Sequence, residues 1–123
     1  MTSFSRKFLA SFANAFHGIL LLFRSQINAR IELGITLVVI VAGLVFGIST
    51  IEWIVIILCI ALVLSLEGIN TAIEIFADKL HPGFDTEIGK AKDVAAGAVL
   101  IASMLVAIIG IVIFAPKVFE RLF

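Results

Sequence analysis

Apolar residues recur at helical spacing near the start of the chain. Between residues 4 and 24 they return every three or four positions, and polar residues such as Lys7, Asn14 and Arg24 fall between them. A helix with one apolar and one polar face lies on a membrane surface when the rest of the chain offers no soluble core to cover it. The pattern therefore predicts an amphipathic surface helix over residues 4–24.

Three further segments are apolar over a length that suits a membrane crossing, which takes about twenty helical residues. They extend from about 31 to 48, from 53 to 77 and from 94 to 115. We expect the last helix to end before Pro116, because proline lacks the backbone N–H that a continuing helix needs. The sequence thus predicts an all-α membrane protein, in which residues 1–123 form one domain of a surface helix and three transmembrane helices.

Composition agrees with this fold class. Apolar residues make up 62% of the chain, and the mean hydropathy of +1.23 lies well above that of soluble globular proteins. Nine basic and nine acidic residues give a net charge of zero, so we expect no nucleic-acid partner. The single cysteine, Cys59, excludes a disulfide framework and a zinc cluster.

Basic residues near the spans predict the orientation. They precede the first span and lie in the polar stretch 79–92 between the second and third spans, whereas residues 47–52 contain none. Because cytoplasmic segments carry the excess of lysine and arginine, the N-terminus is expected in the cytoplasm and the C-terminus outside. The residues on the cytoplasmic side are Arg6, Lys7, Arg24, Arg30, Lys79, Lys90 and Lys92.

A polar stripe runs along the second span. Glu67, Asn70, Glu74 and Asp78 follow one another at steps of three, four and four residues, which places them on one helix face. If Trp53 marks the outer interface, Glu67 lies roughly 9 Å inside the apolar layer. A carboxylate there costs about 2.5 to 3.5 kcal/mol. Hydrogen bonds between helices could explain one such residue, but four aligned polar residues favour a chemical site.

The chemistry of these side chains suggests distinct roles. A carboxylate in a medium of low dielectric constant can act as a general base near neutral pH, which suits Glu67. A carboxylate at the wet boundary can bind a divalent cation, which suits Glu74. Lys92 could bind nucleotide phosphates, while Asp93 caps the third span. The alternative for Lys92 is an ordinary cytoplasmic anchor. The polar turn between Gln26 and Glu32 needs no functional explanation.

Two blocks of sequence carry a family resemblance. The run EGINTAIE at residues 67–74 is followed by Asp78 and then by AKDVAAGAVL at residues 91–100. Together with the surface helix and three spans, they resemble the prokaryotic diacylglycerol kinase and undecaprenol kinase family. Soluble nucleotide-binding motifs such as GxxxxGK[ST] are absent from the sequence, so ATP chemistry has to be built on helices.

The resemblance implies transfer of the ATP γ-phosphoryl group to a lipid hydroxyl, in a homotrimer of the bacterial cytoplasmic (inner) membrane. Carried over by matched position, Glu67 is the catalytic base and Glu74 binds Mg²⁺ and nucleotide. Asn70 belongs to the same site, and Lys92 and Asp93 contact the nucleotide. Packing leads to an oligomer as well, since three thin helices cannot enclose a site. Gly43 and Gly47 have the spacing of close helix contacts.

Two positions near the surface helix complete the implied site. Asn14 matches a nucleotide-contacting position. Gln26 stands where some members of the family have a second metal-binding glutamate, and the second ligand stays open between Gln26, Glu32 and a water molecule. The acceptor stays open between undecaprenol and diacylglycerol, with the block AAGAVL and the loop at His81 closer to undecaprenol kinases.

Two other classes of protein are alternatives to a lipid kinase. A small transporter or channel subunit would explain an intramembrane glutamate such as Glu67. It would not explain why Asn70, Glu74, Lys92 and Asp93 gather at one membrane face. A scaffold without chemistry is the third class. Phosphorylation of a membrane lipid is the function that the sequence favours.

Overall fold

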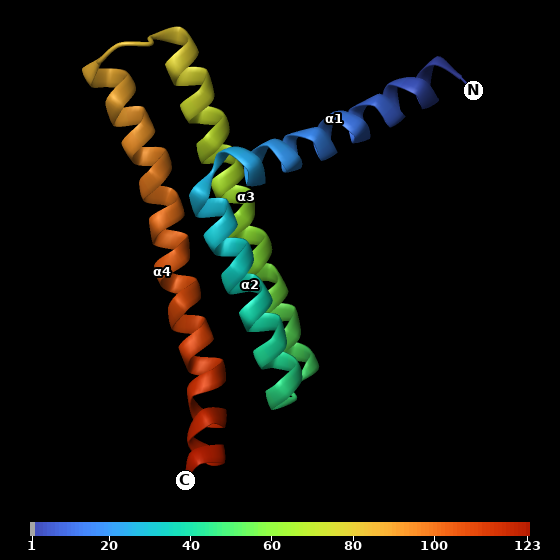
Figure 1. The fold of residues 1–123 in the computed structure, drawn as a ribbon, viewed down its shortest axis with the longest axis vertical. Coiled ribbons are helices and arrows are strands. Elements are labelled where there is room, and N and C mark those ends of the chain that lie inside the picture. Colours follow the sequence, from blue (N-terminus) through green and yellow to red (C-terminus); the bar gives the residue numbers. More distant parts are fainter. Residues whose placement is uncertain (1) are drawn as a thin grey trace.

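Four helices account for nearly all of residues 2–123, which the computed structural model describes. They are α1 (Ser3–Ser25), α2 (Ile27–Phe46), α3 (Thr50–Leu80) and α4 (Thr86–Leu122). The all-α prediction is confirmed. Figure 1 shows α2, α3 and α4 running along one direction, whereas α1 leaves them at a steep angle. Helix α3 packs against both α2 and α4 and so occupies the centre of the bundle.

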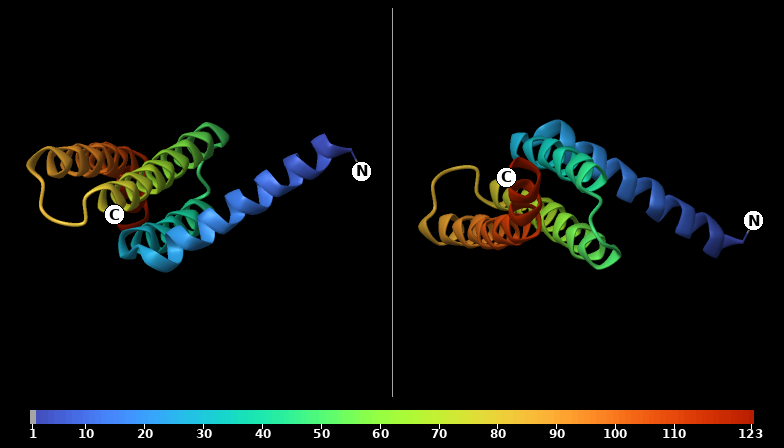
Figure 2. Two further views of the ribbon diagram at one scale, coloured as in Figure 1. Left: turned by 90° about the horizontal axis from the view of Figure 1, so that it is seen from above. Right: turned by 90° about the horizontal axis from the view of Figure 1, so that it is seen from below.

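All four helices are long and apolar enough to cross a membrane. Length and composition alone therefore do not separate α1 from the three predicted spans. Two features distinguish it: α1 contains no buried residue, and both views in Figure 2 show it extending away from the other helices. The placement of α1 on the membrane surface remains a prediction.

The first predicted span begins and ends earlier than expected. Helix α2 starts at Ile27, directly after Gln26, whose extended backbone forms the corner with α1. It ends at Phe46, because Gly47 adopts the left-handed conformation with φ of 62° and forms the C-cap. Ser49 then starts α3 with a capping box, in which Ser49 N donates to Glu52 Oε2 at 2.8 Å and Glu52 N donates to Ser49 Oγ at 3.2 Å.

The polar stretch 79–92 is mostly helical, which corrects the expected long loop. Helix α3 continues to Leu80 and α4 begins at Thr86, so only residues 81–85 connect them. The cause is Asp85, whose Oδ1 accepts hydrogen bonds from Glu87 N and Ile88 N at 3.0 Å each. Asp93 is therefore not the cap of the last helix. It lies inside α4, and the helix N-terminus stands two turns before it.

The expected stop at Pro116 is also wrong. Helix α4 continues through Pro116 to Leu122. Proline removes one hydrogen bond and kinks a helix without always ending it, and Figure 2 shows the last turns of α4 in a different direction from the rest. Contacts with other helices stabilise this last segment. Lys117 Nζ lies 3.3 Å from Glu52 Oε1, and Arg121 Nη2 donates to Val45 O at 2.9 Å.

Arg121 illustrates how the far end of the bundle is closed. Its guanidinium carbon also lies 4.9 Å from the centre of the Phe46 ring, a cation–π contact. Arg121, in the last turn of α4, thus donates a hydrogen bond to the end of α2. The last carbonyl groups of a helix have no partner within the helix, so this bond satisfies one of them. At the same end, the hydrogen bond from Ser49 N and the charge of Lys117 hold the pKa of the Glu52 carboxyl below its usual range.

Most aliphatic side chains of the bundle point outward. A small cluster around Ile48, Ile56 and Ile113 is buried between the helices, while many leucines, isoleucines and valines on α2, α3 and α4 are exposed. In a membrane such side chains contact lipid tails, and helices associate through close packing rather than through burial from water. The bundle is thus built for an apolar surrounding.

Gly43 and Gly47 serve roles other than the expected contact between neighbouring helix backbones. Gly47 caps α2, and Gly43 lies under the Trp53 ring, where an added methyl group would stand 2.6 Å from Trp53 Cη2.

We predict that Gly43→Ala destabilises the protein by about 1 to 3 kcal/mol through overpacking. Gly34→Ala on the same helix is the matched control, since no atom lies within 4 Å of its added methyl group.

Thermal unfolding in detergent micelles tests this prediction. Gly43→Ala should lower the midpoint, whereas Gly34→Ala should leave it unchanged or raise it, because alanine favours helix over glycine by about 1 kcal/mol. Equal midpoints for Gly43→Ala and the wild type would show that the Trp53 ring moves freely and does not fix the α2–α3 contact.

Candidate active site

The polar stripe of α3 passes from the bundle interior to the surface. The exposed fraction is 1% for Glu67 and 7% for Asn70, while Glu74 is half-buried and Asp78 is exposed. A single helix face thus carries a buried carboxylate, a buried amide and two further carboxylates whose exposure increases toward the end of α3.

Helix α4 brings a cation to the outer part of the stripe. Lys92 Nζ lies 2.8 Å from Asp78 Oδ1, in an ion pair that joins α3 to α4. Lys92 precedes the predicted span 94–115, and its hydrogen bond to Asp78 raises the pKa of the Lys92 ammonium, with a further rise from the charges of Glu74 and Asp93. The sequence motifs around Glu67 and Lys92 are therefore brought together in space, and Lys92 stays protonated over the physiological range.

Glu32 is a second acidic group in the bundle. The sequence alone described it as part of a polar interfacial turn, but it lies on α2, and its Oε2 is buried without a hydrogen-bond partner. Glu32 and Thr36 line a cavity of about 200 Å³ between α2, α3 and α4. In the sequence, the four-residue spacing of Glu32 and Thr36 already places both polar side chains on one face of the helix.

Two expected site residues lie on or beside α1. Asn14 is exposed on α1, and Gln26 is half-buried at the corner between α1 and α2. Helix α1 packs against α2 and α3, whereas Lys92 and Asp93 belong to α4. A site that uses all of these residues therefore requires a ligand or another subunit that bridges them.

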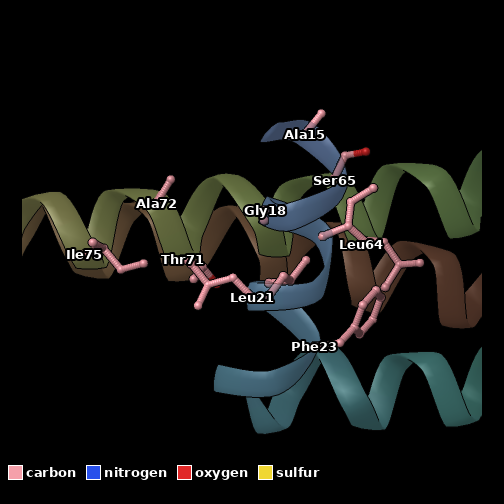
Figure 3. A pocket seen from close by; sticks show the side chains of 12 residues that line it. Ala15, Gly18, Leu21, Phe23, Leu64, Ser65, Thr71, Ala72 and Ile75 are labelled. Carbon is pink, nitrogen blue, oxygen red and sulfur yellow. The ribbon is translucent and has the colours of Figure 1, made fainter. Parts of the chain in front are cut away.

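Sequence reasoning missed Thr71. This side chain is 5% exposed and its Oγ1 has no hydrogen-bond partner, and the same holds for Oδ1 of the neighbouring Asn70. Thr71 lies four residues after Glu67, so the two share one helix face. It also lines an apolar groove between α1 and α3, which Figure 3 shows from close by. The four-residue spacing from Glu67 in the sequence already indicates that Thr71 lies on the same helix face as the candidate base.

Comparison with known proteins identifies the family. The sequence model of prokaryotic diacylglycerol kinase matches residues 13–114. The chain belongs to this family. It is 39% identical over 116 residues to the undecaprenol kinase of Bacillus subtilis (strain 168), which covers 90% of each chain. It is 38% identical over 103 residues to a diacylglycerol kinase of Synechocystis sp. (strain ATCC 27184 / PCC 6803 / Kazusa), covering 83% of this chain and 59% of that one.

Membership in the prokaryotic diacylglycerol kinase family makes this chain a membrane-bound lipid kinase. The resemblance read from residues 67–74 and 91–100 is thereby confirmed. The transporter or channel alternative gains no support from these relatives, because both are named as lipid kinases.

We predict that Glu32→Gln makes this kinase more stable. The substitution keeps the shape of the side chain and replaces an acidic group, whose buried Oε2 has no hydrogen-bond partner, by a neutral amide. A neutral group costs less to bury than a carboxylate, and we expect a gain of about 1 kcal/mol because Glu32 is partly exposed.

The midpoint of thermal unfolding in detergent measures this effect, with Glu87→Gln as the matched control. Glu87 is exposed at the start of α4 and pairs only with Lys90 at 3.0 Å, so its substitution should change the midpoint little. A lower midpoint for Glu32→Gln would mean that the carboxylate has a cationic partner in the assembled enzyme.

Proposed function

We propose that the protein transfers the γ-phosphoryl group of ATP directly to the hydroxyl of a membrane lipid, undecaprenol or diacylglycerol, at the cytoplasmic end of α3 and α4. The observation that carries this proposal is the buried Glu67 at the inner end of a polar helix face, whose outer end is paired with Lys92. The relatives are named as kinases that act on these two lipids.

Glu67 is the general base in this proposal. Its carboxylate is buried among apolar helices, in a position that an acceptor hydroxyl can reach only from the membrane side or along the polar face of α3. Burial makes a carboxylate a better proton acceptor, since the charged form is poorly solvated. Glu67 takes the proton of the lipid hydroxyl while the oxygen attacks the γ-phosphorus, and the bond from that phosphorus to the ADP oxygen breaks in line.

Phosphoryl transfer depends mainly on positioning and on neutralisation of phosphate charge. Lys92 is the cation for this purpose, and its pairing with Asp78 orients the ammonium beside the α3 face. Asp93, next to Lys92 on α4, and Asn70 on α3 contact the nucleotide in this proposal. Asn14 reaches the nucleotide from α1, which requires α1 to lie along the membrane surface on the same side.

A magnesium ion fits this chain only together with the nucleotide. Residues 2–123 contain no group of three histidine, cysteine or acidic side chains that could hold a metal ion. Magnesium in nucleotide-dependent enzymes, however, is held by one or two carboxylates together with substrate phosphates. Glu74 is the carboxylate in this proposal, and the ion would neutralise phosphate charge. Glu32 faces an apolar cavity, so Gln26 or a water molecule is the better second ligand.

The orientation in the cytoplasmic membrane follows from how the two ends of the bundle use their basic residues. Lys79 and Lys90 lie at the end of the α3–α4 hairpin, as does Lys92. At the opposite end, Lys117 pairs with Glu52 and Arg121 binds α2, so both have structural roles there. Lys90 and Lys92 are paired as well, with Glu87 and Asp78, so pairing does not distinguish the two ends. Seven of the nine basic residues, however, belong to α1, the start of α2 and the hairpin end. This distribution favours a cytoplasmic hairpin end and a cytoplasmic N-terminus.

A homotrimer would complete the site in this proposal. Asn70 Oδ1 is buried without a hydrogen-bond partner, and Asn14 lies on a different helix from Lys92, so the residues of one chain do not enclose a nucleotide. Exposed apolar faces on all the helices leave room for close contacts between subunits.

Purified protein in mixed micelles with radiolabelled ATP and either undecaprenol or dioleoylglycerol tests the function. We expect a labelled phospholipid product with at least one of the two lipids, and loss of product when EDTA removes Mg²⁺. Restoration of activity by added Mg²⁺ is the control. If neither lipid is labelled at any magnesium concentration, the proposed function is wrong.

Glu67→Gln tests the base. The amide has nearly the same shape but cannot accept the proton, so we predict that kcat falls by a factor of about 100 to 10,000, while nucleotide binding measured by calorimetry stays within about twofold. Glu120→Gln is the control, since Glu120 is exposed at the far end of α4. A Glu67→Gln enzyme that keeps its kcat would assign the base to another residue.

A further inference from the structure

The cavity of about 200 Å³ between α2, α3 and α4 is lined by none of the residues assigned to the proposed kinase site. Each helix contributes residues at positions i, i+3, i+4 and i+7, which share one helix face. This face extends from Glu32 to Val39 on α2, from Ile56 to Val63 on α3 and from Ser103 to Gly110 on α4. The cavity therefore lies where three helix faces of one chain meet.

The two ends of the cavity differ in polarity. Helices α2 and α4 run in the same direction (Figure 1), so Glu32 and Ser103, the first lining residues on these helices, lie toward the same end. Thr36 follows one turn after Glu32, whereas Val39 and Gly110 form the opposite end. Glu32 and Val39 are seven residues apart, which corresponds to about 10 Å along the helix axis. An elongated molecule with one polar head and an apolar body matches this arrangement.

Glu32 leaves a hydrogen bond unmade at the polar end. Its Oε2 is buried without a partner, and none of the ion pairs within residues 2–123 includes Glu32. A buried carboxyl group without a partner is costly, so a ligand that donates to it gains affinity. A primary amine suits this group better than an alcohol does, because a hydrogen bond between an ammonium and a carboxylate is about twice as strong as a neutral one.

The hydroxyl groups at the same end provide further acceptors. An ammonium group has three N–H donors, of which the Glu32 carboxylate accepts one or two. The hydroxyl oxygens of Thr36 and Ser103 also line the cavity and can accept the remaining bonds. The polar end thus offers an ammonium group one negative charge and two neutral acceptors.

The volume of the cavity limits the ligand to a small molecule. A cavity of about 150 Å³ holds one benzene molecule, so this cavity has room for a ring of that size with a short polar arm. A polyprenol or a diacylglycerol is far too large for it. The aliphatic side chains in the lining, among them the buried Ile56 and Val63, provide the surface that an apolar body contacts.

We propose that the cavity between α2, α3 and α4 is a binding site for a small lipophilic primary amine, which places its ammonium group on Glu32 and its apolar body toward Val39 and Gly110. This site is separate from the proposed kinase site, and its test requires neither ATP nor an acceptor lipid. A negative result therefore leaves the proposed function unchanged.

Thermal unfolding of the full-length protein in detergent micelles measures the binding. Benzylamine is the probe, and ethylbenzene, which has the same shape without the amine, is the control ligand. The dissociation constant follows from how the midpoint rises with ligand concentration. We expect the dissociation constant of benzylamine to be about tenfold higher for Glu32→Gln than for the wild type, since one charged hydrogen bond is lost. The response to ethylbenzene should be the same in both proteins.

Two outcomes of this experiment overturn the proposal. One is a midpoint of the wild type that does not change with benzylamine, as expected if the cavity holds only water. The other is an equal dissociation constant of benzylamine for Glu32→Gln and wild type, which would mean that the amine does not contact Glu32.

Cys59 reports where the ligand lies, because it is the single cysteine of the chain and lines the cavity. Methyl methanethiosulfonate is small enough to enter, and it converts the thiolate into a methyl disulfide with release of methanesulfinate, which mass spectrometry detects. Benzylamine at about ten times its dissociation constant should slow this reaction about tenfold, because only the empty cavity admits the reagent. A thiol that does not react in ligand-free protein would show that small molecules do not enter, and the proposal is overturned.

Gly110→Leu tests the cavity independently of Glu32. A methyl group added at Gly110 meets no atom within 4 Å, so the protein should fold, and the new side chain fills the apolar end. We expect loss of the midpoint increase with benzylamine and a slower reaction of Cys59. Gly97→Leu on the same helix is the matched control, since Gly97 has equal space but lies outside the cavity. If another subunit fills the cavity, Gly110→Leu changes the oligomeric mass in light scattering, benzylamine does not protect Cys59 of the wild type, and the proposal is overturned.

Discussion

The constraint on which the structure depends is a carboxylate in the apolar part of a helical bundle. Glu67 is 1% exposed, and a charged group at such depth costs several kcal/mol unless something compensates it. Along the same face of α3, burial decreases from Glu67 and Asn70 to the half-buried Glu74 and the exposed Asp78. Helix α3 accordingly occupies the centre of the bundle and extends past the length of a simple span.

Helix length places the chemistry at one end of the bundle. Helices α3 and α4 are 31 and 37 residues long, more than the roughly 20 residues that a bilayer requires. Their connection is only five residues, 81–85, so Asp78 and Lys92 emerge side by side and form their ion pair. If residues 79–92 formed a loop, as expected from the sequence, no helix would fix the position of Lys92 relative to the α3 face.

Periodicity made the fold class and the polar stripe predictable, because both depend on spacing within one helix. Features that depend on neighbouring helices were not predictable. Helix α4 continues past Pro116 because Lys117 and Arg121 gain contacts with other helices. The need for glycine at position 43 comes from the Trp53 ring of α3, which leaves no space for a side chain there. Asp85 has a side chain suited to an N-cap, but it lies nine residues before the apolar run that begins at Val94, whereas Asp93 directly precedes that run.

The two ends of the bundle differ in how their polar groups are satisfied. At the end that carries the α2–α3 turn, Ser49 and Glu52 bond each other, Glu52 pairs with Lys117, and Arg121 caps α2. Near Glu67, by contrast, buried oxygens of three residues lack partners, namely those of Glu32, Asn70 and Thr71. Evolution tolerates such a cost where a ligand or another subunit supplies the missing bonds. The unsatisfied atoms therefore favour the part of the bundle around Glu67 as the candidate binding region, independently of any family resemblance.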